Sequence, residues 1–167
     1  SRRFITAASL RNAALAVSAS GGSTNAVLHL TAIAAEAGVA FGVEDCNDAC
    51  EAAPVICDLK PGGRYLAHHL FEAGGTRLVM NRLMAAGKLT DTPTVSGRSL
   101  FEEAGEAVES AGQQVVRSFA DPALAHVLHA GDEVADLADA QALAGHRLGA
   151  DDADLEQLVG GSGRHHD

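Results

Sequence analysis

The sequence predicts an α/β fold that is predominantly helical, with a few short strands and a poorly defined C-terminal region. Apolar residues recur at helical spacing through most of the chain before Pro122, and glycines follow several of these segments where helices commonly end. The apolar runs at residues 55–57 and 115–116 are short, so any strands are brief. After Pro122 the composition shifts to Ala, Asp, Gly and His, which favours a different kind of structure.

Three helices are predicted early in the chain, over residues 6–18, 26–37 and 43–52. The first carries apolar residues at helical spacing and ends before Gly21. The second is apolar at nearly every position and stops at Gly38, so we expect it to be buried on most sides and to lie at the centre of the core. Acidic residues favour the first turn of the third helix, and Pro54 ends it.

The middle of the chain is predicted to hold a helical hairpin, over residues 65–73 and 76–86. Gly74 and Gly75 separate its two helices, and Gly87 ends the second. Residues 55–57 form a brief buried strand before a glycine-rich loop, and residues 115–116 begin another extended piece. Ser99 can cap a further helix that reaches about residue 110.

Composition excludes several classes of protein. The length of 167 residues suits one ordinary domain, and the net charge of −10 argues against a nucleic-acid partner, which Lys and Arg patches would bind. No apolar run approaches the ~20 residues that span a bilayer, so no membrane partner is expected. Three cysteines without a secretory signal argue for a reducing compartment, and we predict a cytoplasmic protein.

The stretch from Gly21 to Leu30 is predicted to hold an anion at a helix start. Glycines allow a tight turn, one of the short polar residues caps the helix, and the free N–H groups there favour a carboxylate or phosphate. The alternative is an ordinary capped helix after a turn. We take Gly22, Ser23, Thr24 and Asn25 as candidate substrate-binding residues.

Two cations in the glycine-rich loop are further candidates for binding a substrate carboxylate. Arg64 can bind a carboxylate through two parallel N–H donors of its guanidinium, and Lys60 can attract it as a point charge. The alternative is that both are solvated charges on a surface loop. Cys46, Cys50 and Cys57 resemble a metal site, but their spacing is more typical of buried cysteines that pack as small hydrophobes. No residue of this chain is predicted to ligate a metal or to be catalytic.

Four blocks of the sequence resemble the dihydroxy-acid and sugar-acid dehydratase family. The blocks are Gly21-Gly-Ser-Thr-Asn-Ala-Val-Leu-His-Leu30, Pro54-Val-Ile-Cys-Asp-Leu-Lys-Pro-Gly-Gly-Arg-Tyr65, Ala73-Gly-Gly75 and Thr94-Val-Ser-Gly97. They occur in the family's order and at about its spacing. The resemblance reaches to about Pro122. The chain is short for this family, so we expect an internal segment of a longer enzyme.

The resemblance implies a hydro-lyase that converts 2,3-dihydroxy carboxylic acids to 2-keto acids, as in branched-chain amino acid biosynthesis. A sugar-acid (aldonate) dehydratase relative is an alternative. Another is an inactive truncated or frame-shifted chain, or an interaction module. The resemblance also implies an anionic dihydroxy-acid substrate and a homo-oligomer.

The family's cofactors are an iron–sulfur cluster and Mg²⁺, and its base is a serine near the far C-terminus. The blocks that carry these groups do not match this chain, so we expect it to be incomplete and inactive alone. By this resemblance residues 1–97 belong to the N-terminal cluster and substrate domain, and residues 98–122 connect toward a second domain. Residues 123–167 are unmatched and are expected to be a flexible tail.

Overall fold

The computed structural model describes residues 2–123, all of which belong to one of the two units into which the chain divides, Ser1–Ala130. Helices account for about half of these residues, which confirms the predominantly helical fold. The α-helices of this part of the chain are α1 (Ala7–Ala19), α2 (Asn25–Ala37), α3 (Val43–Glu51), α4 (Ala67–Ala73), α5 (Gly75–Ala85) and α6 (Leu100–Gly105). A short 3₁₀ helix, Arg2–Phe4, precedes them. The predicted flexible tail lies outside the described residues, apart from residue 123.

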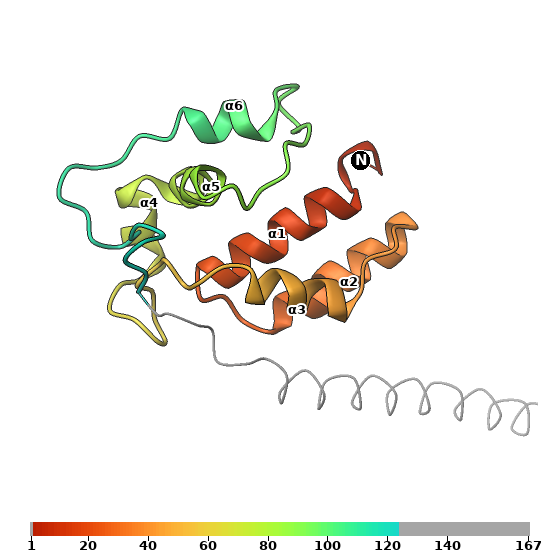
Figure 1. Cartoon of the computed structure of the whole chain (residues 1–167), viewed down its shortest axis with the longest axis horizontal. Helices are drawn as coiled ribbons and strands as arrows, with labels where there is room; N and C mark the ends of the chain where they lie inside the picture. The colour runs from red at the N-terminus through yellow and green to blue at the C-terminus, as the bar shows by residue number, and fades with distance from the viewer. Residues whose placement is uncertain (1, 124–167) are drawn as a thin grey trace, which may run out of the picture. The chain divides into compact units, whose positions relative to one another are not determined.

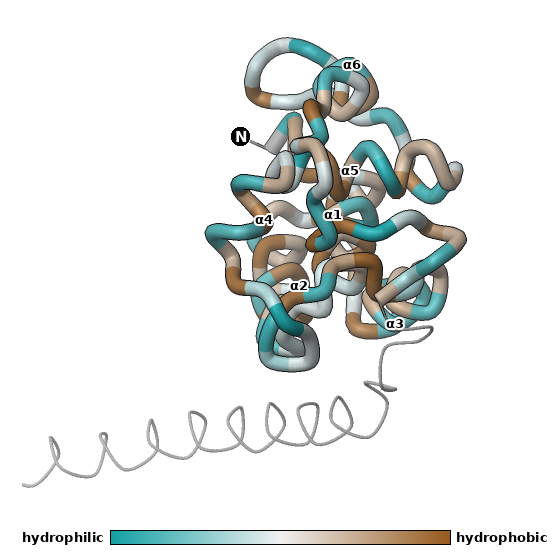
Figure 2. The backbone as a smooth tube through the Cα atoms, turned by 90° about the vertical axis from the view of Figure 1, so that its left-hand side faces the viewer, coloured by the Kyte–Doolittle hydropathy of each residue, from teal (hydrophilic) through white to brown (hydrophobic). Residues whose placement is uncertain are grey.

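Helix α1 is the centre of the core. It begins in a capping box, in which Thr6 Oγ1 accepts the Ser9 N–H at 3.1 Å and Ser9 Oγ accepts the Thr6 N–H at 2.9 Å. The helix runs between α5 and the pair formed by α2 and α3, and it contacts all three (Figure 1). Leu15 has no exposed surface, and the hydrophobic stretches of the backbone gather around α1 (Figure 2).

Helix α2 is not the buried centre that its composition predicts. Its bounds agree with the prediction and Gly38 ends it with a φ of 70°, but only Ala34 is fully buried and Ile33 keeps 43% of its surface exposed. The physical reason is its position, since within the described residues α2 packs mainly on α1 and α3. Apolar content alone therefore predicted the wrong helix as the core of this unit.

The two predicted extended pieces pair with each other. Asp58 N–H donates to the Val115 carbonyl and Arg117 N–H donates to the Ile56 carbonyl, both at 2.8 Å, around an antiparallel bridge between Cys57 and Val116. Within the described residues, the predicted strands are therefore present only as isolated β-bridges. The Ile56 and Cys57 N–H groups also donate to the Ala19 carbonyl, at 2.8 and 3.1 Å, which fixes this pair against the end of α1.

The predicted hairpin is present as α4 and α5, which turn at Gly74 with a φ of 137°. Helix α6 begins after the Ser99 cap as expected, but it ends at Gly105, well before the predicted residue 110. The chain leaves the helix because Ser110 is tied to the end of α4, where its N–H donates to the Ala73 carbonyl at 3.1 Å. Within the described residues, no helix combines the length and apolar character needed to cross a membrane.

Candidate functional site

The two glycines of the opening stretch close α1 in a Schellman motif. Gly21 has a φ of 67° and its N–H donates to the Ser18 carbonyl at 2.9 Å, while the Gly22 N–H donates to the Val17 carbonyl at 2.8 Å. A Cβ on Gly22 would lie 2.8 Å from Val17 Cγ1, so this position requires glycine through close approach to α1. The N–H groups of both glycines are therefore already engaged.

The next three residues begin α2 and keep part of their hydrogen-bonding capacity. Ser23 Oγ accepts the Asn25 N–H at 3.2 Å, and the Ser23 carbonyl accepts the Ala26 N–H at 3.0 Å. Thr24 occupies the N-cap position without a side-chain capping bond. Among the described residues no group bonds the N–H of Ser23 or Thr24, or the side chain of Thr24 or Asn25. These are the donors that remain open at the predicted anion site.

The glycine-rich loop is organised around the buried carboxylate of Asp58. Arg64 donates to it twice, from Nε to Oδ2 at 2.6 Å and from the backbone N–H to Oδ1 at 2.9 Å. The Arg64 side chain remains 63% exposed, so its terminal nitrogens stay accessible. The predicted carboxylate fork is thus partly used inside the protein, and Lys60 lies exposed on the same loop.

Burial by itself raises the pKa of Asp58, but the hydrogen bonds from the Arg64 side chain and backbone, with the charges of Arg64 and Arg117, hold that pKa below its usual value of 3.8. A lowered folded-state pKa means that the carboxylate stabilises the fold fully above the unfolded pKa and that this contribution is lost as pH falls through the folded pKa. The loop is therefore acid-sensitive.

We expect the Asp58→Asn variant to be less stable than the parent chain at neutral pH and to lose less further stability on acidification. The reason is that asparagine makes no ion pair with Arg64 and has no proton to gain. Urea unfolding of both chains at about pH 7 and about pH 3 measures the difference. Equal losses on acidification in the two chains would contradict the assignment of this sensitivity to Asp58.

The two groups of candidate residues lie at opposite ends of one segment, residues 55–58. A Cβ on Gly21 would lie 3.4 Å from Val55 Cγ1, and Asp58 at the other end holds Arg64. No hydrogen bond or ion pair within residues 2–123 joins the donors at Ser23–Asn25 directly to Lys60 or Arg64.

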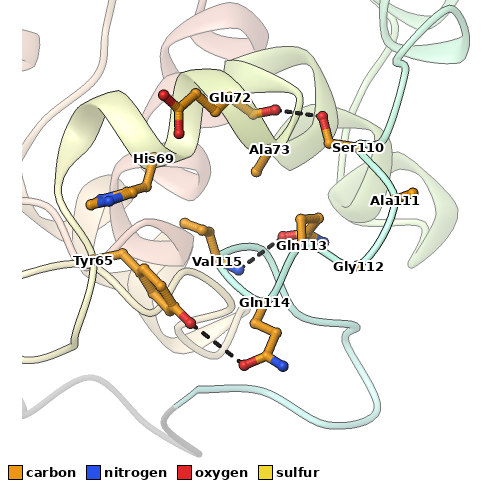
Figure 3. A pocket seen from close by; sticks show the side chains of 10 residues that line it. All are labelled: Tyr65, His69, Glu72, Ala73, Ser110, Ala111, Gly112, Gln113, Gln114 and Val115. Atoms are coloured by element: carbon orange, nitrogen blue, oxygen red, sulfur yellow. Dashed lines mark hydrogen bonds between the residues drawn. The ribbon is translucent and has the colours of Figure 1, made fainter.

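A small cleft of about 270 Å³ beside α4 was not predicted from the sequence (Figure 3). Tyr65 and Gln114 both line it, and the Tyr65 hydroxyl points toward Gln114 Oε1 at 3.5 Å. His69 lines the cleft, but its Nδ1 accepts the Leu66 N–H at 3.0 Å and so caps α4. No motif of the sequence indicates this cleft, because its residues come from two segments, 65–73 and 110–115, that meet only in the fold.

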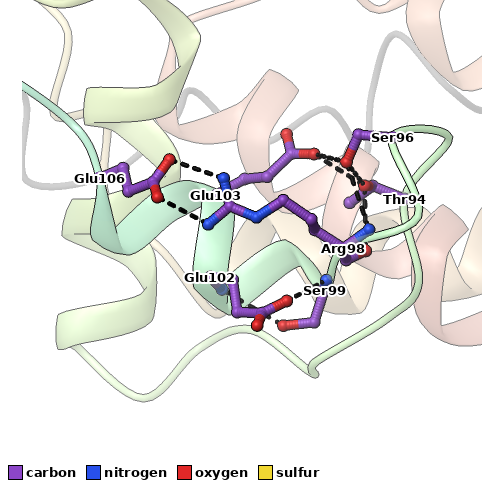
Figure 4. A network of polar contacts seen from close by, with 7 residues as sticks. All are labelled: Thr94, Ser96, Arg98, Ser99, Glu102, Glu103 and Glu106. Carbon is purple, nitrogen blue, oxygen red and sulfur yellow. Dashed lines mark hydrogen bonds and ion pairs between the residues drawn. The ribbon is translucent and has the colours of Figure 1, made fainter.

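The Thr94-Val-Ser-Gly97 block forms a polar network at the start of α6 (Figure 4). The Thr94 and Ser96 hydroxyls donate to Glu103 Oε1, and Arg98 forms a two-bond ion pair with Glu106 at 2.7 and 2.8 Å. These bonds satisfy the side chains locally, so the block serves to position α6.

The three cysteines of the chain are free thiols, and Cys46 and Cys57 are buried. Within the described residues no group of three His, Cys, Asp or Glu side chains is placed to hold a metal ion. Burial raises the pKa of Cys57 to about 12, and burial with the nearby Cys50 and Asp45 raises that of Cys46 to about 11. Cys46 and Cys57 lie in the buried hydrophobic cluster, which supports the interpretation that they pack as small hydrophobes.

We expect iodoacetamide to alkylate Cys50 before Cys46 and Cys57 in the folded chain. Cys50 is half-buried, whereas the other two thiols are buried and stay protonated at neutral pH. Mass spectrometry of the peptides after timed labelling measures the order, and the urea-unfolded chain, in which all three should react alike, is the control. Labelling of Cys57 as fast as Cys50 would contradict the described packing.

The family model described as "Dihydroxy-acid/6-phosphogluconate dehydratase N-terminal" matches residues 1–103. The chain belongs to this family.

Curated relatives support the assignment. The chain is 48% identical over 121 residues to the dihydroxy-acid dehydratase of Koribacter versatilis, which covers 72% of this chain and 21% of the relative. It is 51% identical over 115 residues to that of Thermus thermophilus, with 68% and 21% coverage. The relative from Roseiflexus castenholzii is 45% identical over 122 residues, with 72% and 22% coverage. The chain therefore spans about a fifth of the length of these relatives.

Proposed function

We propose that this chain is the substrate-side part of a hydro-lyase that dehydrates 2,3-dihydroxy carboxylic acids to 2-keto acids. The observation that carries the proposal is the match over residues 1–103 to the N-terminal model of the family, together with relatives named dihydroxy-acid dehydratase. Because the chain spans about a fifth of those relatives, we propose that it supplies part of the site and needs the remainder for activity.

The proposed role is to hold the negatively charged end of the substrate. Dehydration removes the C2 proton and the C3 hydroxyl group, so the carboxylate next to C2 must stay fixed while the reacting bonds break. The exposed terminal nitrogens of Arg64 can form a bidentate pair with a carboxylate, and Lys60 adds a point charge. The open donors of Ser23, Thr24 and Asn25, next to the Gly22 turn, supply neutral hydrogen bonds.

The family resemblance implies an iron–sulfur cluster and Mg²⁺, but the residues described here do not fit either group. Cys46 and Cys57 are buried among apolar side chains, and no set of three potential ligands converges within residues 2–123. We therefore derive no step through these cofactors. We propose that both groups, and the base that takes the C2 proton, are held by other parts of the longer enzyme, as the family resemblance implies.

Several finer assignments belong to the same proposal. A sugar acid is a second candidate substrate, because the matched family model also covers 6-phosphogluconate dehydratases. Residues 1–97 are proposed as part of the N-terminal domain and residues 98–122 as a connector toward a second domain. A cytoplasmic location rests on the cysteine usage of the chain, and a homo-oligomeric assembly rests on the family resemblance.

A chimera tests the proposal. In the Thermus thermophilus enzyme, the matching segment is replaced by that of this chain, and formation of 2-keto acid from a 2,3-dihydroxy acid is measured. The proposal predicts dehydratase activity in the chimera and none in the isolated chain. A chimera that folds like its parent but makes no 2-keto acid would contradict it.

A further inference from the structure

A second cleft, which shares Gln113 and Gln114 with the first, is lined by three arginines. Its volume is about 460 Å³, and the arginines come from three separate parts of the chain: Arg64 from the glycine-rich loop, Arg82 from α5 and Arg117 from the segment after the Cys57–Val116 bridge. Because the three arginines are far apart in the sequence, the sequence does not indicate this grouping. No motif of the sequence places Arg82 or Arg117 beside Arg64.

Gln113 lines this cleft, and hydrogen bonds hold its side-chain amide in place. Its Oε1 accepts the N–H groups of Val115 and Val116, both at 2.9 Å, and its Nε2 donates to the Val116 carbonyl and to Glu109 Oε1 at 2.7 and 2.6 Å. Glu109 in turn accepts from Arg82 Nη2 at 2.6 Å. The Gln113 amide therefore positions the Glu109 carboxylate, which in turn positions Arg82. This wall of the cleft is thus ordered without a ligand.

The cleft contains more donors than its carboxylates can use. Each guanidinium has five N–H donors. Within residues 2–123, the guanidinium of Arg64 donates only its Nε–H to Asp58, that of Arg82 only an Nη2 group to Glu109, and that of Arg117 only an Nη2 group to Asp121. The Nε–H of Arg82 is buried and has no acceptor among the described residues. An oxyanion that entered the cleft would lie among three guanidinium groups that keep unused N–H donors.

We propose that this arginine cleft, lined by Arg64, Arg82 and Arg117, binds the oxyanion group of a small molecule, either a carboxylate or a phosphate. Forked guanidinium groups match the oxygen spacing of both anions, and Arg is the residue that recognises them bidentately. The natural ligand rests on the proposed function, since Arg64 also belongs to the substrate-side loop. The substrates of this family are acids, and those of its 6-phosphogluconate branch also carry a phosphate.

Titration of the ¹⁵N-labelled 167-residue chain tests the cleft directly. Inorganic phosphate and glycerate, the smallest 2,3-dihydroxy carboxylate, are added in separate series at constant ionic strength, with chloride as the reference anion. The side-chain Nε–H resonances of Arg64, Arg82 and Arg117 should shift together and saturate at one Kd. The resonance of Arg98, whose ion pair with Glu106 lies outside the cleft, should not follow them. Saturation by phosphate alone, glycerate alone or both identifies the group bound.

Two matched variants separate the cleft from general charge effects. Arg117→Gln and Arg98→Gln each remove one arginine from an exposed ion pair, so both change the net charge equally. Arg117→Gln should weaken binding about tenfold or more, which is the loss of one charge-assisted hydrogen-bond pair, and Arg98→Gln should leave the Kd unchanged. Equal weakening by both variants, or shifts that never saturate, would overturn the proposal.

The outcome is separable from that of the chimera. If the chimera makes 2-keto acid but the cleft binds neither probe, the proposed oxyanion site is wrong and the proposed function stands. If the cleft binds a probe saturably but the chimera is inactive, the oxyanion site stands and the proposed function is wrong. The titration needs no turnover, so the missing catalytic groups do not affect it.

Discussion

Replacing Gly63 by alanine should lower the free energy of unfolding by about 3 kcal/mol or more. Two costs contribute to this loss: overpacking of the loop, and the loss of hydrogen bonds to a buried carboxylate. A Cβ at this position would overlap the carbonyl carbon and Oδ1 of Asp58 and would lie 2.6 Å from the Leu59 nitrogen. The loop cannot make room without moving Asp58 away from Arg64. Urea unfolding followed by circular dichroism measures the change.

Gly62 provides the matched control for this substitution. A Cβ there meets nothing within 4 Å, and its φ is not positive, so Gly62→Ala should change stability by less than about 0.5 kcal/mol. Equal effects of the two substitutions would show that the loop is not packed around Asp58 as described.

The second large effect is expected in α1. Leu15→Ala should cost about 2–5 kcal/mol, because Leu15 is completely buried where α1 meets its neighbours and the cavity left behind cannot collapse fully. Ile33→Ala in α2 should cost less than about 1.5 kcal/mol, since 43% of the Ile33 surface is already exposed. Thermal and urea unfolding of both variants test this ranking. A larger loss for Ile33→Ala would restore α2 as the core.

Local signals predicted most of the helices correctly. Helical spacing, capping residues and terminal glycines located α1 to α5 to within a residue or two, because these features act within one turn of the chain. The end of α6 was missed, since it depends on Ser110 bonding the end of α4, a contact between residues far apart in sequence. The burial of α2 was misjudged for the same reason. Apolar composition shows that a helix has a face to bury but not which neighbours surround it.

The candidate site could be predicted only as a set of residues. Motif blocks pointed to Gly22, Ser23, Thr24, Asn25, Lys60 and Arg64, and whether these bind substrate stays a prediction. What the sequence could not show is that the glycine N–H groups close α1, or that Asp58 takes the Nε–H of Arg64. Asp58 lies inside the recognised block beside Lys60 and Arg64, so its carboxylate was a visible signal for an internal partner of Arg64. The arginine cleft had no such signal, because Arg82 and Arg117 approach Arg64 only in the folded chain.

The measurement that tests the substrate-side role most directly is the effect of Asn25→Ala on the Thermus thermophilus chimera. The Asn25 side chain makes no hydrogen bond within the described residues, so its removal should leave the melting temperature unchanged. If Asn25 donates to the substrate, kcat/KM should fall about tenfold or more, the loss of one hydrogen bond to a charged group. Ser23→Ala is the control, because it removes the capping acceptor and should lower the melting temperature. An Asn25→Ala chimera with unchanged kcat/KM would show that this stretch is only a helix start, and it would contradict the proposed role of the chain.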